Sequence, residues 1–406
     1  MRVIHRALCI ILILLVSSCN RVNIEDQIDT SFSSSQNTEI DPEYNVTPEK
    51  PKEEKLTLIM FGDALLHKAV YTDAETQVGF QDTGCTTKTY DFSHMLQYIK
   101  PIVQGYDLAF YNQETILGGT ELGLSTYPRF NSPQEFGDAM IEAGFNLVSL
   151  ANNHTLDKNE AGVLSSRKYW LDKMSGCEII ASGSYESQED RDKPRILEKN
   201  GIRYTLLAYT YGTNGIPIPN GKGYLVNVYD EEMLKKDIAE IRDKVDLLIV
   251  SIHWGNEYTF KPTQHQKYIA KLLINAGADI VIGHHPHVIQ PIELVDGQPV
   301  IYSLGNMISN QDQLYCQIGM MVGCNVIKVC DEDGSGVGER DGAIKRRIKI
   351  DNIKPELIYT SRDKNNKNFR IIPFSILNDD VLKDYKEIEK RYMEKIGYCS
   401  SEPNVF

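Results

Sequence analysis

Three histidines fall within four positions of one short stretch, "GHHPH", in a chain that contains only nine histidines. They are His284, His285 and His287, and they directly follow an apolar run. Imidazole binds divalent transition metals and transfers protons near neutral pH, so this spacing can support chemistry. An exposed loop can also carry histidines without any chemistry, and the other polar clusters of the chain decide between the two interpretations.

Five further segments place polar side chains directly after an apolar run. In chain order they read "GDALLH", "NQET", "LANNHTLD", "HWGNEY" and, beyond the histidine stretch, "SLGN". Aspartate, glutamate, asparagine and histidine without cysteine suit Mn²⁺, Zn²⁺ or Fe²⁺, whereas Ca²⁺ prefers oxygen ligands. A single isolated histidine would favour a structural role. Polar clusters that follow one apolar run after another favour a divalent-metal site instead. On an extended segment, His285 and His287 would point to the same face and approach one metal centre.

Apolar runs and amphipathic segments alternate from residue 56 onward, which is typical of an α/β fold with layered sheets. The runs predict strands, several buried on both faces, at 56–62, 107–111, 145–151, 202–209, 246–252, 279–283 and 299–305. Helical spacing and capping residues predict helices at 132–144, 156–174, 230–244 and 263–277. Ligands bind at the carboxyl ends of strands in open α/β sheets, so the polar clusters are expected to converge on one edge.

The sequence pattern becomes less regular after about residue 330. Residues 56–330 carry all the polar clusters and form the expected main domain. Residues 331–406 are expected to be a C-terminal extension that packs on the same domain, with an exposed loop at 331–342. Four apolar residues make one stripe of an expected terminal helix: Val381, Tyr385, Ile388 and Tyr392.

The first residues predict export and lipid anchoring. Two arginines precede an apolar run at 7–16 that is too short to span a bilayer comfortably. Residues 1–18 are therefore predicted to be a lipoprotein signal peptide, and Cys19 of the lipobox-like "VSSC" to be the lipidated N-terminus. An ordinary secretory signal with an incidental Cys19 is the alternative. The polar segment 19–55 predicts a disordered tether between a bacterial membrane and the domain.

The composition of this 406-residue chain limits the kinds of molecule that it can bind. Its formal net charge of −13 argues against nucleic acid as a partner. An anionic substrate must then meet local positive charge from a metal or a few basic side chains. The sequence has no C-x-x-C pair that would indicate a zinc ribbon and no Walker A loop that would indicate use of ATP. Export permits disulfides, but the cysteine spacing leaves their connectivity open.

The ordered clusters resemble the CapA family of capsule-synthesis proteins, also described as poly-γ-glutamate biosynthesis proteins, over about residues 56–310. That family is similar to calcineurin-like metallophosphatases, which implies a four-layered α/β/β/α sandwich and one or two divalent ions, Mn, Zn or Fe. The resemblance implies these metal ligands: Asp63, Glu114, Asn153, His253, His285 and His287. His284 is an alternative ligand to His285, because either of the two adjacent histidines can align with the ligand position of the family. His67 lies four residues after Asp63, where phosphatases have a histidine two residues after.

Further roles are expected for the other residues at the strand ends. By the resemblance, His154 lies beside the substrate as an acid or an orienting donor, and the alternative is that it only holds its loop through Asp157. Substrate contacts are expected from Asn112, Asn152, His284, Trp254, Glu257 and Asn306. For Trp254, as for Tyr258, packing in the core or at the rim is the open alternative.

Three functions fit these features. The resemblance favours a membrane-anchored protein that makes, transfers or trims an anionic capsular polymer such as poly-γ-glutamate, with membrane-bound capsule-synthesis proteins as partners. Such a protein would be a metal-dependent hydrolase or transferase of the cell envelope. The second function is an exported metallophosphoesterase acting on an envelope phosphoester, since a metal pair serves phosphoryl and acyl chemistry alike. The third is a non-catalytic binding lipoprotein that kept the fold and lost the reaction.

Overall fold

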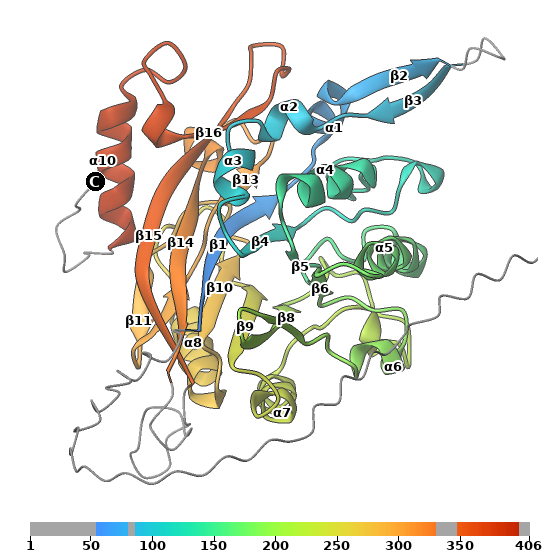
Figure 1. Cartoon of the computed structure of the whole chain (residues 1–406). Helices are drawn as coiled ribbons and strands as arrows, with labels where there is room; N and C mark the ends of the chain where they lie inside the picture. Colours follow the sequence, from blue (N-terminus) through green and yellow to red (C-terminus); the bar gives the residue numbers. More distant parts are fainter. Residues whose placement is uncertain (1–53, 80–85, 330–346, 398–406) are drawn as a thin grey trace, which may run out of the picture. The chain divides into compact units, whose positions relative to one another are not determined.

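Two large sheets organise the part of the chain that the computed structural model describes, residues 54–79, 86–329 and 347–397 (Figure 1). The larger sheet has the strand order β16-β15-β14-β1-β4-β5-β6, and β13 also pairs with β1. It is mixed, because β1 runs parallel to β4 and antiparallel to β14. Its strands are β1 (Lys55–Ala64), β4 (Leu108–Gln113), β5 (Leu147–Ser149), β6 (Ile180–Ser182), β13 (Asn306–Ile308), β14 (Ile318–Lys328), β15 (Ile348–Ser361) and β16 (Arg370–Pro373).

The smaller sheet has six strands in the order β11-β12-β10-β9-β8-β7. Its four central strands are parallel, and a hairpin closes each edge. The strands are β7 (Leu197–Lys199), β8 (Ile202–Thr210), β9 (Leu247–His253), β10 (Ile280–His284), β11 (Ile292–Val295) and β12 (Gln298–Ile301). A separate two-stranded hairpin consists of β2 (Glu75–Gly79) and β3 (Thr86–Tyr90).

Alternate residues of β1 face two different cores, which places this strand between two layers. Leu58 and Met60 pack between the sheets, together with apolar residues of β8, β9 and β10. Ile59 and Phe61 instead pack among residues of the helices on the other face. A strand buried on both faces reads as a continuous apolar run, which is why its sequence predicted a buried strand.

Helices cover the outer face of each sheet. α4 (Glu135–Ala143) and α5 (Asn159–Met174) pack on the larger sheet, and α7 (Glu231–Arg242) and α8 (Gln264–Ala276) pack on the smaller one. The order is helix, sheet, sheet, helix, which confirms the predicted four-layered α/β/β/α sandwich. The other helical elements are α1 (Lys68–Asp73), α2 (Ser93–Leu96), α3 (Lys100–Val103), η1 (Thr120–Leu122), α6 (Gln188–Arg191), η2 (Gly223–Leu225), α9 (Leu314–Gln317), η3 (Phe374–Ile376) and α10 (Tyr385–Ile396).

Local capping chemistry sets the ends of the two helices on the smaller sheet. α8 begins with a capping box, in which the Thr263 side chain accepts from the Gln266 N–H and the Gln266 side chain accepts from the Thr263 N–H. Asp230 caps α7 by accepting from the Met233 N–H. Helix α8 stops at Gly277, whose φ of 126° is accessible mainly to glycine.

The C-terminal region contributes strands to the larger sheet. β14 and β15 pair along their lengths, across the position at which an extension was expected to begin. The terminal helix α10 adds Ile388 and Tyr392 to the core between the sheets, as the apolar stripe predicted. Val381 was assigned to that stripe wrongly, because it precedes the helix and is 39% exposed.

Some sequence predictions lie outside the described residues, namely the signal peptide, the lipidated Cys19, the tether up to residue 53 and the loop at 331–342. In the ranges that the structure does describe, no helix combines the length and the hydropathy needed to cross a membrane. The cysteines within those ranges, Cys177, Cys316 and Cys324, are free thiols.

Candidate metal centre

The strand ends bring two rows of polar residues against each other. In the larger sheet, Asp63 of β1 is in register with Asn306 of β13 on one side and Asn112 of β4 on the other. In the smaller sheet, His253 of β9 is in register with His284 of β10. A 3.0 Å contact between His284 Nδ1 and Asp63 Oδ1 joins the two rows. Polar strand ends from both sheets therefore meet at one edge of the sandwich.

Two glycines allow this close approach of the strand ends. A Cβ at Gly62 would overlap the carbonyl oxygen of Gly305, the atom that accepts the N–H of Asp63 at 2.9 Å. A Cβ at Gly283 would overlap the carbonyl oxygen of Tyr302 in the same way. Glycine directly before Asp63 and directly before the histidine stretch is thus a packing requirement of the site.

The carboxylate of Asp63 is buried and is held by neighbours from both sheets. Asn112 Nδ2 donates to its Oδ1 at 2.9 Å, and the backbone N–H of His285 donates to its Oδ2 at 3.3 Å. Burial alone would raise the pKa of Asp63, but the hydrogen bond and charge of His284, with the charge of His287, hold that pKa below its usual value. Asp63 is therefore an anion in the folded protein.

Glu114 follows β4 and carries two buried carboxylate oxygens that have no hydrogen-bond partner. Its Oε1 lies 3.6 Å from His253 Nε2 and 3.7 Å from His287 Nε2. Burial, reinforced by the charge of Asp63, raises the pKa of Glu114 well above its usual value. A buried carboxylate without donors is costly unless a proton or a cation compensates it. Because two imidazole nitrogens face the same oxygen, a cation shared with them is the chemically matched partner.

His253 and Asn153 face each other from different sheets. His253 Nε2 lies 2.9 Å from Asn153 Oδ1. Burial and the neighbouring imidazoles, His285 first among them, lower the pKa of His253 well below its usual value. The neutral ring is the form of histidine that binds a metal.

The histidine stretch turns sharply where β10 ends at His284. His285 and His287 have φ angles of 95° and 54°, in the left-handed region that residues other than glycine rarely adopt. The prediction that the two side chains share one face of an extended segment is therefore wrong. The turn brings them together instead, with ring centroids 6.0 Å apart, and it places His285 4.9 Å from His253. Burial lowers the pKa of His285 to about 3, so this ring is neutral as well.

Asn306 fixes which nitrogen of His287 carries a proton. The amide nitrogen of Asn306 donates to Gln311 Oε1 at 2.7 Å and to the Cys316 carbonyl oxygen at 2.9 Å. Its amide oxygen therefore faces His287 Nδ1, at 2.9 Å, and accepts a hydrogen bond from it. The other ring nitrogen, Nε2, then presents a lone pair on the side of Glu114, as a ligand histidine would.

Within the described residues, three overlapping groups of side chains can hold a metal ion, each with ligand atoms within 4.8 Å of one another. The groups are Glu114 with His253 and His285, Asp63 with Glu114 and His287, and Glu257 with His285 and His287. Two of them share Glu114, and Asn153 adjoins the first through His253. The structure thus brings the six predicted ligands together, and their donor types and the unpartnered oxygens of Glu114 fit one or two divalent ions. His284 is in none of the groups, so the geometry favours His285 where the sequence left the choice open.

His154 directly follows Asn153 and is tied to its own loop. Its Nδ1 lies 2.7 Å from Asp157 Oδ2, and the same oxygen accepts the backbone N–H of Phe130 at 2.6 Å. The Phe130 ring packs edge-on against the imidazole, with centroids 4.8 Å apart. Since the carboxylate can only accept, Nδ1 carries the proton. His154 therefore makes the contact with Asp157 that the structural alternative requires. This contact orients the ring through Nδ1 and leaves Nε2 available.

Three asparagines that were expected to contact substrate are buried supports of the site. Asn112 donates to Asp63, and Asn306 accepts from His287. Asn152 donates to the carbonyl oxygen of Gln113 and accepts the backbone N–H of His154. These contacts give all three asparagines a positioning role, although Asn112 Oδ1 has no hydrogen-bond partner, and their contact with substrate stays a prediction.

The three other residues expected to contact substrate lie in different environments. Trp254 is fully buried in the core against α7 and α8, and its indole N–H donates to the Tyr302 carbonyl oxygen at 3.0 Å. Trp254 therefore packs in the core, as the alternative interpretation held, and its contact with substrate stays a prediction. His284 is buried against Asp63. Glu257 alone of the six is exposed, beside His285 and His287.

The loop after β8 contributes residues that the sequence interpretation missed. The Tyr211 ring lies 4.8 Å from His285 and nearly parallel to His253, and Asn214 Oδ1 accepts from Asn153 Nδ2 at 3.1 Å. Tyr211 is 44% exposed, so it borders the solvent side of the site. The polar segment "TYGTNG" follows the predicted strand 202–209, and the rule used for the other strand ends would have identified it.

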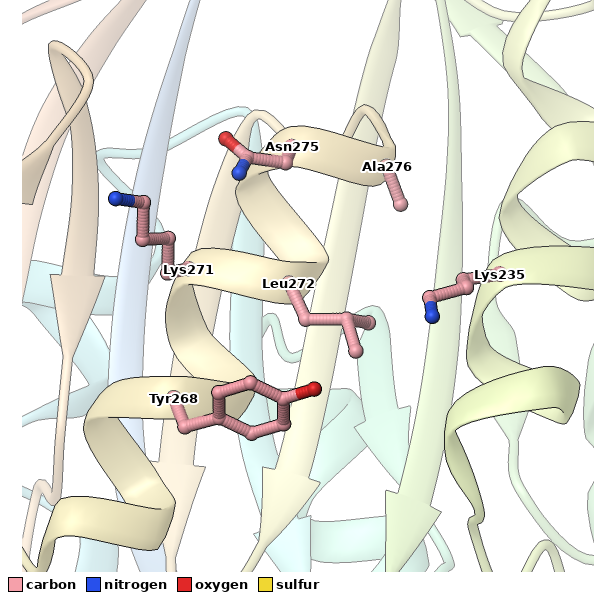
Figure 2. Close-up of a pocket in the computed structure, with 6 residues that line it drawn as sticks. All are labelled: Lys235, Tyr268, Lys271, Leu272, Asn275 and Ala276. Atoms are coloured by element: carbon pink, nitrogen blue, oxygen red, sulfur yellow. The ribbon is translucent and has the colours of Figure 1, made fainter.

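A cleft of about 430 Å³ on α7 and α8 is separate from the candidate metal centre (Figure 2). It is lined by Lys235, Tyr268, Lys271, Leu272, Asn275 and Ala276. Glu231 offsets part of the positive charge of this cleft, because its carboxylate pairs with Lys235. The same carboxylate accepts a hydrogen bond from the Tyr268 hydroxyl at 3.0 Å. None of its residues belongs to a strand end, so it adds nothing to the metal site.

The fold and the converging strand ends together define an α/β/β/α protein of the metallophosphatase-like class. Residues 57–311 match the family described as bacterial capsule synthesis protein PGA_cap. This span contains every polar cluster of the site, and the chain belongs to that family.

Two relatives carry names that agree with this family. The chain is 28% identical over 277 residues to the capsule biosynthesis protein CapA of Bacillus anthracis, which covers 66% of this chain and 63% of the relative. It is 28% identical over 232 residues to the PGA biosynthesis protein CapA of Bacillus subtilis, which covers 53% and 57%. The chain thus spans less than two thirds of each relative's length. A crystal structure of a hypothetical protein from Thermus thermophilus aligns with 74% of this chain and 98% of its own, at 13% identity and a TM-score of 0.41.

Proposed function

We propose that this protein is a lipid-anchored, metal-dependent enzyme of the bacterial cell envelope that makes, transfers or trims an anionic polymer such as poly-γ-glutamate. The observation that carries the proposal is Glu114, a buried carboxylate with two unpartnered oxygens that faces the imidazoles of His253 and His287. The capsule and PGA biosynthesis names of the relatives support the polymer. The lipobox-like Cys19 supports anchoring, and membrane-bound capsule-synthesis proteins would then be its partners.

The proposed metal ligands divide into two sets that share Glu114. Asp63 and His287 make one set with it. His253, His285 and the adjoining Asn153 make the other. When bound, a divalent ion supplies a Lewis acid and an activated water for attack on an acyl or phosphoryl centre.

The protein's own contribution to the reaction is orientation and proton transfer. Asp157 holds His154 with the proton on Nδ1, which leaves Nε2 as the atom that takes up or gives a proton at the substrate. Tyr211 and Glu257 lie on the solvent side and border the entry of an extended polymer. Asn306 keeps His287 in the tautomer that a metal requires.

A metallophosphoesterase acting on an envelope phosphoester is the second candidate function. It is favoured by the two ligand groups that share one carboxylate, since paired metal sites are common in phosphoryl transfer. His67 departs from the phosphatase pattern in its spacing, because it lies four residues after Asp63 instead of two, and burial lowers its pKa to about 4. The donor set alone does not distinguish phosphoester from amide chemistry.

The test uses the full chain, solubilised in detergent and stripped of metal. Metal content is measured after reconstitution with Mn²⁺ or Zn²⁺, and hydrolysis or transfer is followed on poly-γ-glutamate and on a panel of phosphoesters. The expected result is metal-dependent activity on the polymer, lost in Glu114→Gln and kept in Glu240→Gln, an exposed carboxylate on α7. Activity on phosphoesters alone would select the second candidate. A protein that binds no metal and acts on neither substrate would be a non-catalytic binding lipoprotein.

A further inference from the structure

Asn214 occupies a tight turn that begins just after β8. The residues Thr213-Asn214-Gly215-Ile216 form this turn, and the N–H of Ile216 donates to the Thr213 carbonyl oxygen at 2.9 Å. Asn214 and Gly215 have φ angles of 51° and 75°. Asparagine followed by glycine is the sequence that such a turn, with two left-handed central residues, prefers. Backbone geometry alone therefore explains why an asparagine is tolerated here.

The turn does not explain the contacts of the Asn214 side chain. Its Oδ1 accepts a hydrogen bond from Asn153 Nδ2 at 3.1 Å, and its Nδ2 lies 3.5 Å from His154 Nδ1. Asn153 and His154 follow a strand of the larger sheet, whereas Asn214 follows a strand of the smaller one. One amide thus bonds across the sandwich to a proposed metal ligand, and it lies beside the ring of the proposed proton-transfer residue, whose Nδ1 proton is directed to Asp157.

We propose that Asn214 is a positioning residue of the candidate metal centre, which holds the Asn153 amide with its oxygen toward the metal. The two ends of a carboxamide have nearly the same shape, but only the oxygen can bind a cation. Because Asn214 Oδ1 can only accept, it selects the orientation in which Asn153 Nδ2 points away from the site. This leaves Asn153 Oδ1 beside His253 Nε2, at 2.9 Å.

The loop after β8 is also bonded to the strand that carries His253. The N–H of Tyr211, two residues before the turn, donates to the His253 carbonyl oxygen at 3.1 Å, and the Thr213 hydroxyl braces the turn internally by donating to the Ile216 carbonyl oxygen at 2.7 Å. Both members of the His253–Asn153 pair are therefore attached to the loop after β8, His253 through the backbone of Tyr211 and Asn153 through the Asn214 side chain. Partners that orient ligands in this way typically contribute about 10–100-fold to metal affinity.

The test measures Mn²⁺ affinity by calorimetry on the full chain in detergent, which keeps it independent of any substrate. Asn214→Gly preserves the left-handed turn and removes the amide, and Asn214→Asp keeps an oxygen that accepts from Asn153. The matched control is Asn200→Gly, because Asn200 and Gly201 have φ angles of 51° and 81° in a similar turn at the opposite end of β8. We expect Asn214→Gly to weaken Mn²⁺ binding about 10–100-fold, Asn214→Asp to restore most of the affinity, and Asn200→Gly to leave it unchanged.

The outcomes separate this inference from the proposed function on which it rests. A wild-type protein that binds no Mn²⁺ would refute the metal centre and the inference together. A wild-type protein that binds Mn²⁺ no better than Asn214→Gly does would refute the inference alone. The inference also fails if Asn214→Asp is as weak as Asn214→Gly, or if Asn200→Gly weakens binding equally, because either result would reduce Asn214 to a turn residue.

Discussion

Replacement of Glu114 by glutamine should have opposite effects on the metal-free and the metal-loaded protein. Glu114 is fully buried, neither of its oxygens accepts a hydrogen bond, and burial together with Asp63 raises its pKa well above the usual value. Glutamine has nearly the same shape and carries no charge. The substitution therefore removes the electrostatic cost of a buried carboxylate in the metal-free protein, and it also removes the carboxylate that two of the three ligand groups share.

The two effects have comparable magnitudes and opposite signs. Without metal, relief of a buried, unsatisfied carboxylate is expected to stabilise Glu114→Gln by about 1–3 kcal/mol. With metal, the wild-type protein gains about 4 kcal/mol when the free ion is present at about 1,000 times its Kd. The variant should lose most of that gain, so the order of stability reverses when metal is added.

The pH dependence of the metal-free protein gives a further signature of Glu114. Its folded pKa is raised above the unfolded value of 4.5, so its contribution to stability is complete below that pH and is lost as the pH rises toward the folded pKa. The stability advantage of Glu114→Gln should therefore grow with pH above 4.5, by at most about 1.4 kcal/mol per unit.

Thermal and urea unfolding of the full chain in detergent, with EDTA or with Mn²⁺, would measure both effects. Glu240→Gln, on the exposed side of α7, controls for loss of a carboxylate and should behave like the wild type under both conditions. A metal-free Glu114→Gln protein that is less stable than the wild type at about pH 8 would contradict the electrostatic argument. An equal Mn²⁺-induced stabilisation in wild type and variant would remove Glu114 from the metal site.

Three further predictions follow from the described contacts and from the sequence. His154→Gln should leave Mn²⁺ content and folding nearly unchanged while activity on the true substrate falls about 10²–10⁴-fold, and full activity of the folded variant would exclude His154 from proton transfer. The metal-free protein should lose stability as the pH falls from 6.5 toward about 3, because burial depresses the pKa of His285, and His285→Gln should flatten the pH dependence of unfolding in that window. Cys19→Ala should abolish incorporation of labelled lipid and leave unprocessed precursor, whereas equal labelling of both proteins would show that Cys19 is not the anchor.

The apolar runs predicted layered α/β sheets because the central strands are buried on both faces, and the resemblance to the CapA family supplied the four-layered order. β1, β8, β9 and β10 read as apolar runs, and each predicted range agrees with the observed strand within a few residues. β15 was missed for the opposite reason. Its buried residues are few and irregularly spaced and it contains Pro355, so its pattern resembles that of a loop rather than of a buried strand.

Convergence of the ligands was predictable because it depends on topology alone. Parallel strands end at one edge of a sheet, so Asp63 and Asn112 must gather in one sheet and His253 and His284 in the other. The conformation of the histidine stretch was not predictable in the same way. Positive φ angles at His285 and His287 are unfavourable locally, and only the surrounding contacts, including the bond from the His285 N–H to Asp63, select them.

The roles of the asparagines depend on contacts that no local pattern encodes. Asn153, Asn214 and Asn306 have the same side chain, and each lies close to a strand end. Asn153 directs its oxygen to His253 because Asn214, from the other sheet, accepts from its nitrogen. Asn306 directs its oxygen to His287 because Gln311 and other acceptors occupy its nitrogen. Which end of an amide faces a metal is thus decided by hydrogen bonds between segments that are distant in the chain, and for this reason the sequence identified the ligands better than the residues that orient them.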